Sequence, residues 1–423
     1  MSSLLIQGIP LIDLAKTYGT PLYVYDAEKI AHQVHTLRAA FSSLPVRLLY
    51  AAKALSTQAI LQLMHRLGTG LDAVSIQEVQ LGLLAGFSPS DILFTPNGVS
   101  FEEIAQAVQL GVRINIDNIS LLEQFGHQYG SSVPCCVRLN PHILAGGHAK
   151  ISTGHIDSKF GISILQLRHL KRVIQSWGIR INGLHVHTGS DILDANAFLE
   201  MARLLFEVGV EFPELEFIDF GSGFKVAYRP GDITTDVNGL AESLKAEYEA
   251  FLRSYGRPVE IWFEPGKFFV SEAGYLLVQV NVVKSTPAAV FVGVNSGLNH
   301  LIRPMFYDAY HDIVNLSRTS GPQRVYTIVG YICETDTFGS DRLLHEVQEG
   351  DILAIKNAGA YGFTMSSNYN SRLRPAEVLV YRGRPYLIRR AETLEDLLRT
   401  QYLSIWEEIE ASLAGAYPEN RLS

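Results

Sequence analysis

The amino-acid sequence predicts an α/β plus all-β protein, in which a parallel (β/α)8 barrel of the TIM type precedes an antiparallel β-barrel or β-sandwich domain. Within residues 46–264, short apolar runs alternate with stretches of helical spacing, which is typical of parallel β/α architecture. Eight such runs over roughly 220 residues fit a closed barrel, whereas six or seven would favour an open sheet. After residue 270 the runs follow one another with few helical stretches between them, which indicates an antiparallel β-domain.

The barrel strands are expected at the eight apolar runs 46–53, 70–74, 92–96, 112–117, 134–140, 181–188, 215–221 and 260–264. Helices are expected between them, for example at 57–67, 76–85 and 101–109. Many runs end in polar residues or glycine, among them Lys53, Asn97, Asp117, Arg138, Asn140, His187, Gly221–Gly223 and Glu264. Because the carboxyl ends of barrel strands form one rim, these residues should converge on an active-site face.

The β-domain should contain strands at 275–283, 289–294, 325–332, 352–355, 377–381 and 386–388, with a hairpin turn at 382–385. The run 19–26 precedes the barrel and is expected to add a strand to this domain. The tail, 394–413, has the pattern of an amphipathic helix. The predicted division is therefore a barrel over 26–271 and a β-domain built from 1–25 and 272–423.

Composition narrows the class of protein. The chain has 423 residues, of which 47% are hydrophobic and 18% charged, so it is globular and not disordered. The formal net charge is -8 and no run of Lys and Arg stands out, which argues against a nucleic-acid partner. No stretch approaches the ~18 apolar residues of a membrane span, and the N-terminus does not resemble a signal peptide.

The chain has three cysteines, Cys135, Cys136 and Cys333. The first two are adjacent in a predicted strand and should point to opposite faces, so they are not expected to pair. No Cys/His spacing typical of a metal site is present. This usage fits a reducing compartment and predicts a cytoplasmic protein without a structural metal.

Three motifs at the predicted rim suggest chemistry. Lys53 ends an apolar strand, where partial desolvation would lower its pKa and free the amine for Schiff-base formation, although an ordinary surface lysine is the commoner reading of this motif alone. Gly221-Ser222-Gly223 follows the seventh strand, a position at which backbone N–H groups often bind phosphate. Glu264 follows the eighth strand, where a fixed carboxylate could hold a proton on a heterocyclic nitrogen.

Two mechanisms compete for these residues. His185 and His187 are two apart, so a strand would place both on one face, as in the zinc site of a hydrolase. The other strand ends offer an arginine and a glycine-rich loop, which do not suit a metal cage. Pyridoxal phosphate needs a Schiff-base lysine, a phosphate loop, an acid for the pyridine nitrogen and a flat side chain against the ring. Lys53, Gly221–Gly223, Glu264 and His187 match those four needs together.

Seven motifs occur in an order typical of one family: YAAKAL around Lys53, HVHTGS around His187, FGSGF at 220–224, FEPGK at 263–267, IRPMFYDAYH at 302–311, CETDTF at 333–338 and NAGAYGFTMSSNYN at 357–370. On these motifs nearly the whole chain resembles the fold type III, alanine-racemase-like family of pyridoxal-phosphate-dependent decarboxylases. Within that family it is most similar to the enzymes that act on diaminopimelate.

The resemblance implies a role for each matching residue. Lys53 would form the Schiff base with the cofactor, His187 would stack on its ring, and Glu264 would hold the proton on its pyridine nitrogen. The remaining cofactor contacts would come from Ser190, Gly221, Ser222, Gly223, Pro265, Gly266, Lys267 and Tyr361. Substrate would be bound by Lys267, Arg303, Tyr307, Glu334 and Tyr361. Cys333 would protonate the carbon after carbon dioxide leaves, and it would come from the partner chain of a homodimer with shared active sites.

Three positions depart from the family pattern. Lys267 stands where the family has an arginine, so the charge is kept but the bidentate fork is lost. Thr188 replaces an isoleucine, and Ser222 replaces the middle glycine of the phosphate loop, with less freedom in φ. None of the three changes removes a reactive group.

The expected reaction is the decarboxylation of meso-2,6-diaminopimelate to L-lysine, the last step of lysine biosynthesis. The nearest alternative is a decarboxylase of another basic amino acid, of the ornithine, arginine or carboxynorspermidine type. Those relatives carry Asp where this chain has Glu334. An alanine racemase would place Arg and not Glu264 at the pyridine nitrogen. A zinc-dependent hydrolase and a cofactor-binding protein without catalysis are the remaining alternatives. From the residues alone, an inert thiol is the favoured interpretation of Cys333. Arg303 and Tyr307, four residues apart, could equally be a structural pair on one helix face.

Overall fold

A closed ring of eight parallel strands forms one half of the molecule in the computed structural model, which describes residues 4–143, 158–187, 189 and 195–416. The strands are β4 (Val46–Ala51), β5 (Gly70–Ala73), β6 (Ile92–Phe94), β7 (Arg113–Ile116), β8 (Cys135–Asn140), β10 (Ile181–His185), β11 (Phe217–Asp219) and β12 (Glu260–Phe263). Each pairs with the next, and β12 pairs with β4 to close the ring. The (β/α)8 prediction is confirmed, and each of the eight expected runs contains one of these strands. A two-residue strand, β9 (Ile162–Ser163), pairs with β8 beside the ring.

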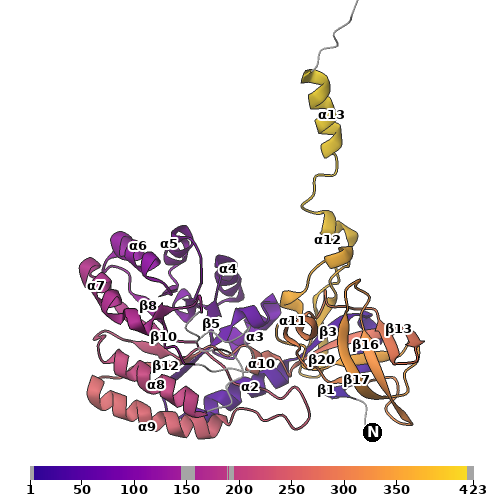
Figure 1. The fold of residues 1–423 in the computed structure, drawn as a ribbon, viewed down its shortest axis with the longest axis horizontal. Helices are drawn as coiled ribbons and strands as arrows, with labels where there is room; N and C mark the ends of the chain where they lie inside the picture. The colour runs from indigo at the N-terminus through magenta and orange to yellow at the C-terminus, as the bar shows by residue number, and fades with distance from the viewer. Residues whose placement is uncertain (1–3, 144–157, 188, 190–194, 417–423) are drawn as a thin grey trace, which may run out of the picture.

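Helices surround the ring (Figure 1). They are α2 (Ala27–Ala40), α3 (Gln58–Arg66), α4 (Ile76–Ala85), α5 (Phe101–Gln109), α6 (Ile119–Tyr129), α7 (Leu167–Trp177), α8 (Ala195–Gly209), α9 (Val237–Tyr255) and the short α10 (Lys267–Val270). Local sequence sets several of their ends. The side chains of Asp26, Ser75 and Asn118 accept hydrogen bonds from the first turns of α2, α4 and α6.

The barrel interior contains its own small apolar cluster, formed by Leu49, Leu93, Cys136, Phe217 and Trp262. The rings of Phe217 and Trp262 stack with centroids 3.7 Å apart. The guanidinium groups of Arg47 and Arg113 lie 5.2 and 5.3 Å from the Trp262 centroid. Cys135 instead belongs to the main core between barrel and helices, so the two adjacent cysteines do point to opposite faces.

The other half is β-rich. Its path of strands is β17 (Thr337–His345), β16 (Gln323–Val329), β14 (Val290–Val294), β13 (Gly274–Ser285), β3 (Leu22–Asp26), β19 (Ala376–Tyr381) and β20 (Arg384–Arg389), and β18 (Ile352–Ile355) pairs with β13 and with β15 (Ile313–Asn315). The expected N-terminal strand is β3, between β13 and β19. Most pairs are antiparallel, but β14–β16 and β3–β19 are parallel. The sequence did not indicate β15 or β17. At the N-terminus, β1 (Leu5–Ile6) and β2 (Ile9–Pro10) precede α1 (Leu11–Tyr18).

The C-terminal tail forms two helices and not the single helix expected over 394–413. These are α12 (Leu394–Leu398), which begins at a capping box on Thr393, and α13 (Ile405–Ala416). Figure 1 shows α13 projecting away from both halves. Among the described residues, no helix is both long enough and apolar enough to cross a membrane.

Candidate active site

Lys53 lies at the carboxyl end of β4, in a single 3₁₀ turn over Ala52–Ala54. Its Nζ is 2.5 Å from Oδ2 of Asp72, which is fully buried at the third position of β5. The hydroxyl of Thr95, just after β6, donates to the other oxygen of Asp72. Burial alone would lower the pKa of Lys53, but Asp72, with Tyr361 and Glu264, raises it well above its usual range. The expectation of a lowered pKa is therefore wrong, because it did not include the buried carboxylate.

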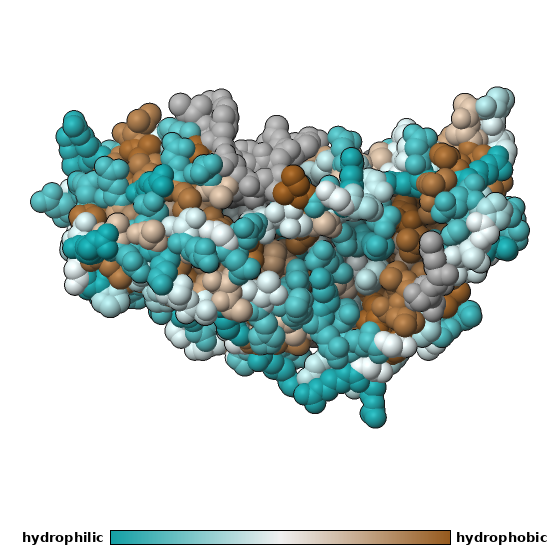
Figure 2. Space-filling model, turned by 90° about the horizontal axis from the view of Figure 1, so that it is seen from below, coloured by the Kyte–Doolittle hydropathy of each residue, from teal (hydrophilic) through white to brown (hydrophobic). Residues whose placement is uncertain are grey.

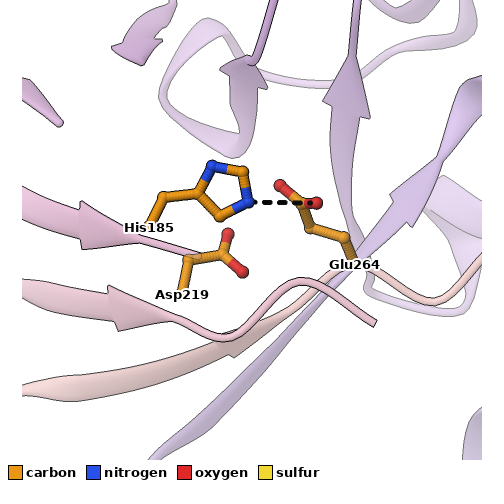
Figure 3. A group of neighbouring side chains, drawn as sticks. All are labelled: His185, Asp219 and Glu264. Atoms are coloured by element: carbon orange, nitrogen blue, oxygen red, sulfur yellow. Dashed lines mark ion pairs between the residues drawn. The ribbon is translucent and has the colours of Figure 1, made fainter. Parts of the chain in front are cut away.

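A second buried group joins the ends of three neighbouring strands (Figure 3). His185 from β10, Asp219 from β11 and Glu264 after β12 bring polar atoms to within 4.8 Å of one another. His185 Nε2 lies 3.6 Å from Glu264 Oε2. On the other side of the ring, the amide nitrogen of Asn115 from β7 lies 2.7 Å from His185 Nδ1. An amide nitrogen donates, so Nδ1 accepts and the ring proton lies on Nε2, toward Glu264.

The pKa values of the two carboxyl groups in this cluster are shifted in opposite directions. Burial, followed by the charge of Glu264, raises the pKa of Asp219 well above its usual range. Burial would also raise the pKa of Glu264, but His185, Lys53 and His187 together lower it below its usual range. The pKa of Asp219 is thus raised and that of Glu264 lowered, because two adjacent buried carboxylates cannot both be charged cheaply.

His187 follows β10 and packs against the loop after β11. The backbone N–H of Ser222 donates to His187 Nδ1 at 3.2 Å, and that of Gly221 donates to Asp219 Oδ1 at 2.7 Å. Burial, followed by the charge of Arg138, lowers the pKa of His187 to about 3, so the ring is neutral. Gly221 has φ +64°, and a Cβ there would lie 2.5 Å from His187 Nδ1, so only glycine fits at this position. Gly223 also has a positive φ, of 142°.

The residues after Glu264 close the rim beside Lys53. The carbonyl of Pro265 accepts from the N–H of Ala51 at 3.3 Å, and Gly266 precedes α10, which begins at Lys267. Tyr361 reaches the same region from the β-rich half, since its N–H donates to the carbonyl of Ala54 at 2.8 Å. Burial raises the pKa of its hydroxyl, while Lys53 and Arg303 oppose that rise. The structure thus places Tyr361 at the barrel rim beside Ala54.

Arg303 begins the short helix α11 (Arg303–Tyr307) and is 7% exposed. Its guanidinium lies 5.3 Å from the ring centroid of Tyr228 and 6.0 Å from that of Tyr307. Within the described parts of the chain, no carboxylate pairs with it. The arginines of the ion pairs described for this chain, such as Arg47 and Arg318, are all more exposed. A buried guanidinium without an acid is costly unless an anion arrives.

Cys333 and Glu334 lie in the β-rich half and are both exposed in the single chain. Cys333 Sγ is 3.6 Å from Glu334 Oε2 and 3.4 Å from the amide nitrogen of Asn370. The hydroxyl of Tyr369 donates to Glu334 and lowers the pKa of that carboxyl. The contacts described for Cys333 include none of the rim residues.

Ser190, expected to bind the cofactor, lies outside the described residues. The paired-histidine zinc site is not formed, because β10 ends at His185 and the two histidines have different neighbours: Asn115 and Glu264 for His185, and the 221–222 loop for His187.

Five residues of this region were missed as site residues: Asp72, Thr95, Asn115, Asp219 and His311. A charged residue inside a short apolar run was the available signal for Asp72 and Asp219. His311 ends the motif at 302–311, but that motif gave it no role. No sequence pattern marked Thr95 or Asn115, because their significance depends on neighbours distant in the chain.

The described residues fit pyridoxal phosphate. Glu264 Oε1 is buried and lacks a hydrogen-bond partner within the described structure, as the acceptor for a protonated pyridine nitrogen requires. His187 supplies a neutral, flat ring, and the glycines of the 221–223 loop allow a close approach. Lys53 supplies the amine. These four features occur at one rim, as the sequence predicted.

Comparison with known proteins agrees with this chemistry. The family model "Pyridoxal-dependent decarboxylase, pyridoxal binding domain" matches residues 27–271. The diaminopimelate decarboxylase of Methanothermobacter thermautotrophicus is 40% identical over 94% of this chain and 95% of its own length. The crystal structure of diaminopimelate decarboxylase from Methanocaldococcus jannaschii with L-lysine covers 94% of this chain and 96% of its own, with a TM-score of 0.87 at 32% identity. The Helicobacter pylori enzyme with L-lysine gives a TM-score of 0.85, also at 32% identity, over 94% of this chain and 99% of its own.

Proposed function

The chain belongs to the family of pyridoxal-dependent decarboxylases, and from this premise we propose that it converts meso-2,6-diaminopimelate to L-lysine and carbon dioxide. The observation that carries the substrate class is Arg303, a buried guanidinium with no acidic partner among the described residues. Diaminopimelate carries a second amino-acid head whose carboxylate can pair with it. Ornithine and 1,5-diamines offer no such group at that end. The relatives named diaminopimelate decarboxylase support the same substrate.

The rim residues would hold the cofactor. Lys53 would attach it, His187 would cover one face of its ring, and Glu264 Oε1 would accept a hydrogen bond from its protonated pyridine nitrogen. The 221–223 loop and Tyr361 would bind its phosphate. When bound, pyridoxal phosphate supplies an electron sink for the electron pair left behind as carbon dioxide departs. The segment after Glu264 is fixed beside Lys53, because the Pro265 carbonyl accepts from Ala51 and Gly266 lies against Ala51 and Ala54. Pro265, Gly266 and Lys267 would also contact the cofactor.

The chain's own groups then perform binding and proton transfer. Arg303 holds the carboxylate of the head that does not react, with Tyr307 beside it. Glu264 stays ionised, and so keeps the pyridine nitrogen protonated. Cys333 Sγ delivers a proton to the carbon that loses carbon dioxide, and Glu334 holds the distal ammonium.

We also propose a homodimer in which Cys333 and Glu334 complete the site of the partner chain. Both residues are exposed in the single chain, whereas a proton donor must reach the substrate. Figure 2 shows hydrophobic patches on the surface of the β-rich half. Val325 and Leu343, both exposed, are partners across β16 and β17. Such a surface is typical of a contact between protein chains. The expected domain division, 26–271 against 1–25 with 272–423, is consistent with the family match over 27–271.

A cytoplasmic location is proposed from the cysteines, since none of Cys135, Cys136 and Cys333 forms a disulfide.

The deciding experiment measures carbon dioxide release from meso-diaminopimelate, ornithine and arginine, with and without added pyridoxal phosphate. Release from diaminopimelate that depends on the cofactor is expected. Release from ornithine alone would overturn the substrate assignment. Lys53→Ala should abolish the visible absorbance of the bound cofactor, and its survival unchanged would overturn the role of Lys53.

A further inference from the structure

His311 is a fully buried histidine that contacts Arg303 and belongs to no step of the proposed reaction. It follows α11 and precedes β15, and its segment pairs with the end of β18, where the N–H of Lys356 donates to the carbonyl of Asp312 at 2.8 Å. His311 Nδ1 lies 2.8 Å from the backbone carbonyl of Lys356. A carbonyl only accepts, so the ring proton lies on Nδ1 and Nε2 carries a lone pair.

That lone pair faces Arg303. Nε of Arg303 donates to His311 Nε2 at 3.4 Å. The ring of Tyr228 also contacts both residues, edge-on to His311 at 5.5 Å and 5.3 Å from the guanidinium carbon. The backbone of β18 thus orients His311, and His311 orients Arg303. Burial, followed by the charge of Arg303, lowers the pKa of His311 to about 3, so Nε2 remains an acceptor at neutral pH.

A guanidinium can receive a carboxylate side-on, through Nε and one terminal nitrogen, or end-on, through Nη1 and Nη2. With Nε bonded to His311, a side-on carboxylate would have to displace that bond, whereas an end-on carboxylate leaves it in place. We propose that His311 is the positioning residue that turns Nη1 and Nη2 of Arg303 toward the substrate's non-reacting carboxylate. This inference rests on the proposed function, and it assigns to His311 the preference for an amino-acid head over a plain amine at that end.

The test compares two ligands that differ only in this carboxylate, L-lysine and 1,5-diaminopentane. Their binding to the cofactor-loaded enzyme is measured by titration calorimetry for wild type, His311→Leu and His311→Gln. His311→Leu should weaken L-lysine binding by about tenfold to a hundredfold, the usual effect of losing a hydrogen bond to a charged group. Binding of 1,5-diaminopentane should change by less than about twofold, because it never meets Arg303. His311→Gln, whose amide oxygen can replace Nε2 as acceptor, should recover most of the loss.

His300→Leu is the matched control. His300 is also fully buried and contacts a backbone carbonyl, that of Leu373, but it has no described bond to Arg303. It should leave the ratio of the two affinities unchanged. In steady state, His311→Leu should raise KM for diaminopimelate more than it lowers kcat.

The inference would be overturned if His311→Leu weakened the binding of both ligands equally and His311→Gln did the same. It would also be overturned if neither variant weakened the binding of either ligand. Both results would leave the decarboxylase assignment intact. A wild-type protein that neither binds L-lysine nor releases carbon dioxide from diaminopimelate would overturn both.

Discussion

Lys53 and Asp72 form an ion pair across two adjacent strands, in which the carboxylate is completely buried and the lysine side chain is 37% exposed. The buried partner cannot move to solvent, so it holds Nζ at one point of the rim. It also keeps the lysine protonated, which explains why the pKa of Lys53 is raised although burial opposes the charge. Attachment of the cofactor therefore requires that this proton be given up.

Asp72→Asn should lower the pKa of Lys53 by about one unit or more, because burial then acts without the opposing carboxylate. The check is the pH dependence of Lys53 labelling by an amine-reactive ester in cofactor-free protein, followed by peptide mass spectrometry. Asp91→Asn removes the partner of Arg47 at another part of the barrel and serves as control. An unchanged labelling midpoint in Asp72→Asn would show that Asp72 does not set the pKa of Lys53.

Gly221→Ala and Gly98→Ala separate backbone strain from contact with the cofactor. Both glycines have a positive φ, +64° and +67°, so each alanine should cost about 1–2 kcal/mol in unfolding free energy. Only at Gly221 would the new Cβ collide with His187, whereas nothing lies within 4 Å at Gly98. Pyridoxal phosphate affinity, followed by absorbance, should fall about tenfold or more for Gly221→Ala alone. Equal affinities in the two variants would contradict the role of His187.

Mixing Lys53→Ala and Cys333→Ala chains tests the shared site. Each variant alone should be inactive. After dissociation and random reassociation, half of the dimers are mixed, and each mixed dimer has one site with both residues intact. Activity should recover to about a quarter of wild type. If the two residues act within one chain, the mixture will stay inactive.

Phe217→Ala should destabilise the protein without touching the rim. Phe217 is buried inside the barrel, stacked on Trp262 between Arg47 and Arg113, so its loss leaves a cavity and an unsupported indole. The expected cost is about 3–5 kcal/mol in unfolding free energy, measured by urea denaturation. Leu84→Ala, at a side chain that is 74% exposed, should stay within about 0.5 kcal/mol of wild type. Similar losses in both variants would contradict the packing described here.

His311 should make stability depend on pH. Its pKa is about 3 in the folded protein, below the ordinary value of a histidine, so the folded state binds fewer protons than the unfolded state between these values. The contribution of the neutral His311 ring to the free energy of unfolding is complete above pH ~6.5 and is lost as the pH falls toward ~3. Relative to His311→Gln, the cofactor-free wild type should lose about 1.4 kcal/mol per pH unit between pH ~6 and ~4. Urea unfolding at several pH values measures this difference, and a difference independent of pH would contradict the buried neutral ring.

The barrel could be predicted from the order of residues, because strand–helix alternation is a local pattern and each of the eight apolar runs contains its strand. The sequence also marked Lys53, His187, Glu264 and the 221–223 loop, since residues at the carboxyl ends of parallel strands share one rim wherever they lie in the chain. In the β-rich half the sequence was less informative. Apolar and polar residues alternate only weakly along β17, and β15 has only three residues, so neither strand stands out from its surroundings.

The charge and orientation of these groups depend on contacts that form in the folded chain. Whether Lys53 holds its proton depends on Asp72, 19 residues away, and the direction of the Arg303 guanidinium depends on His311 and on the carbonyl of Lys356. A pKa or a tautomer follows from burial and from distances of a few ångströms between segments that the chain order does not relate. For that reason the pKa of Lys53 was predicted with the wrong sign, whereas its position was predicted correctly.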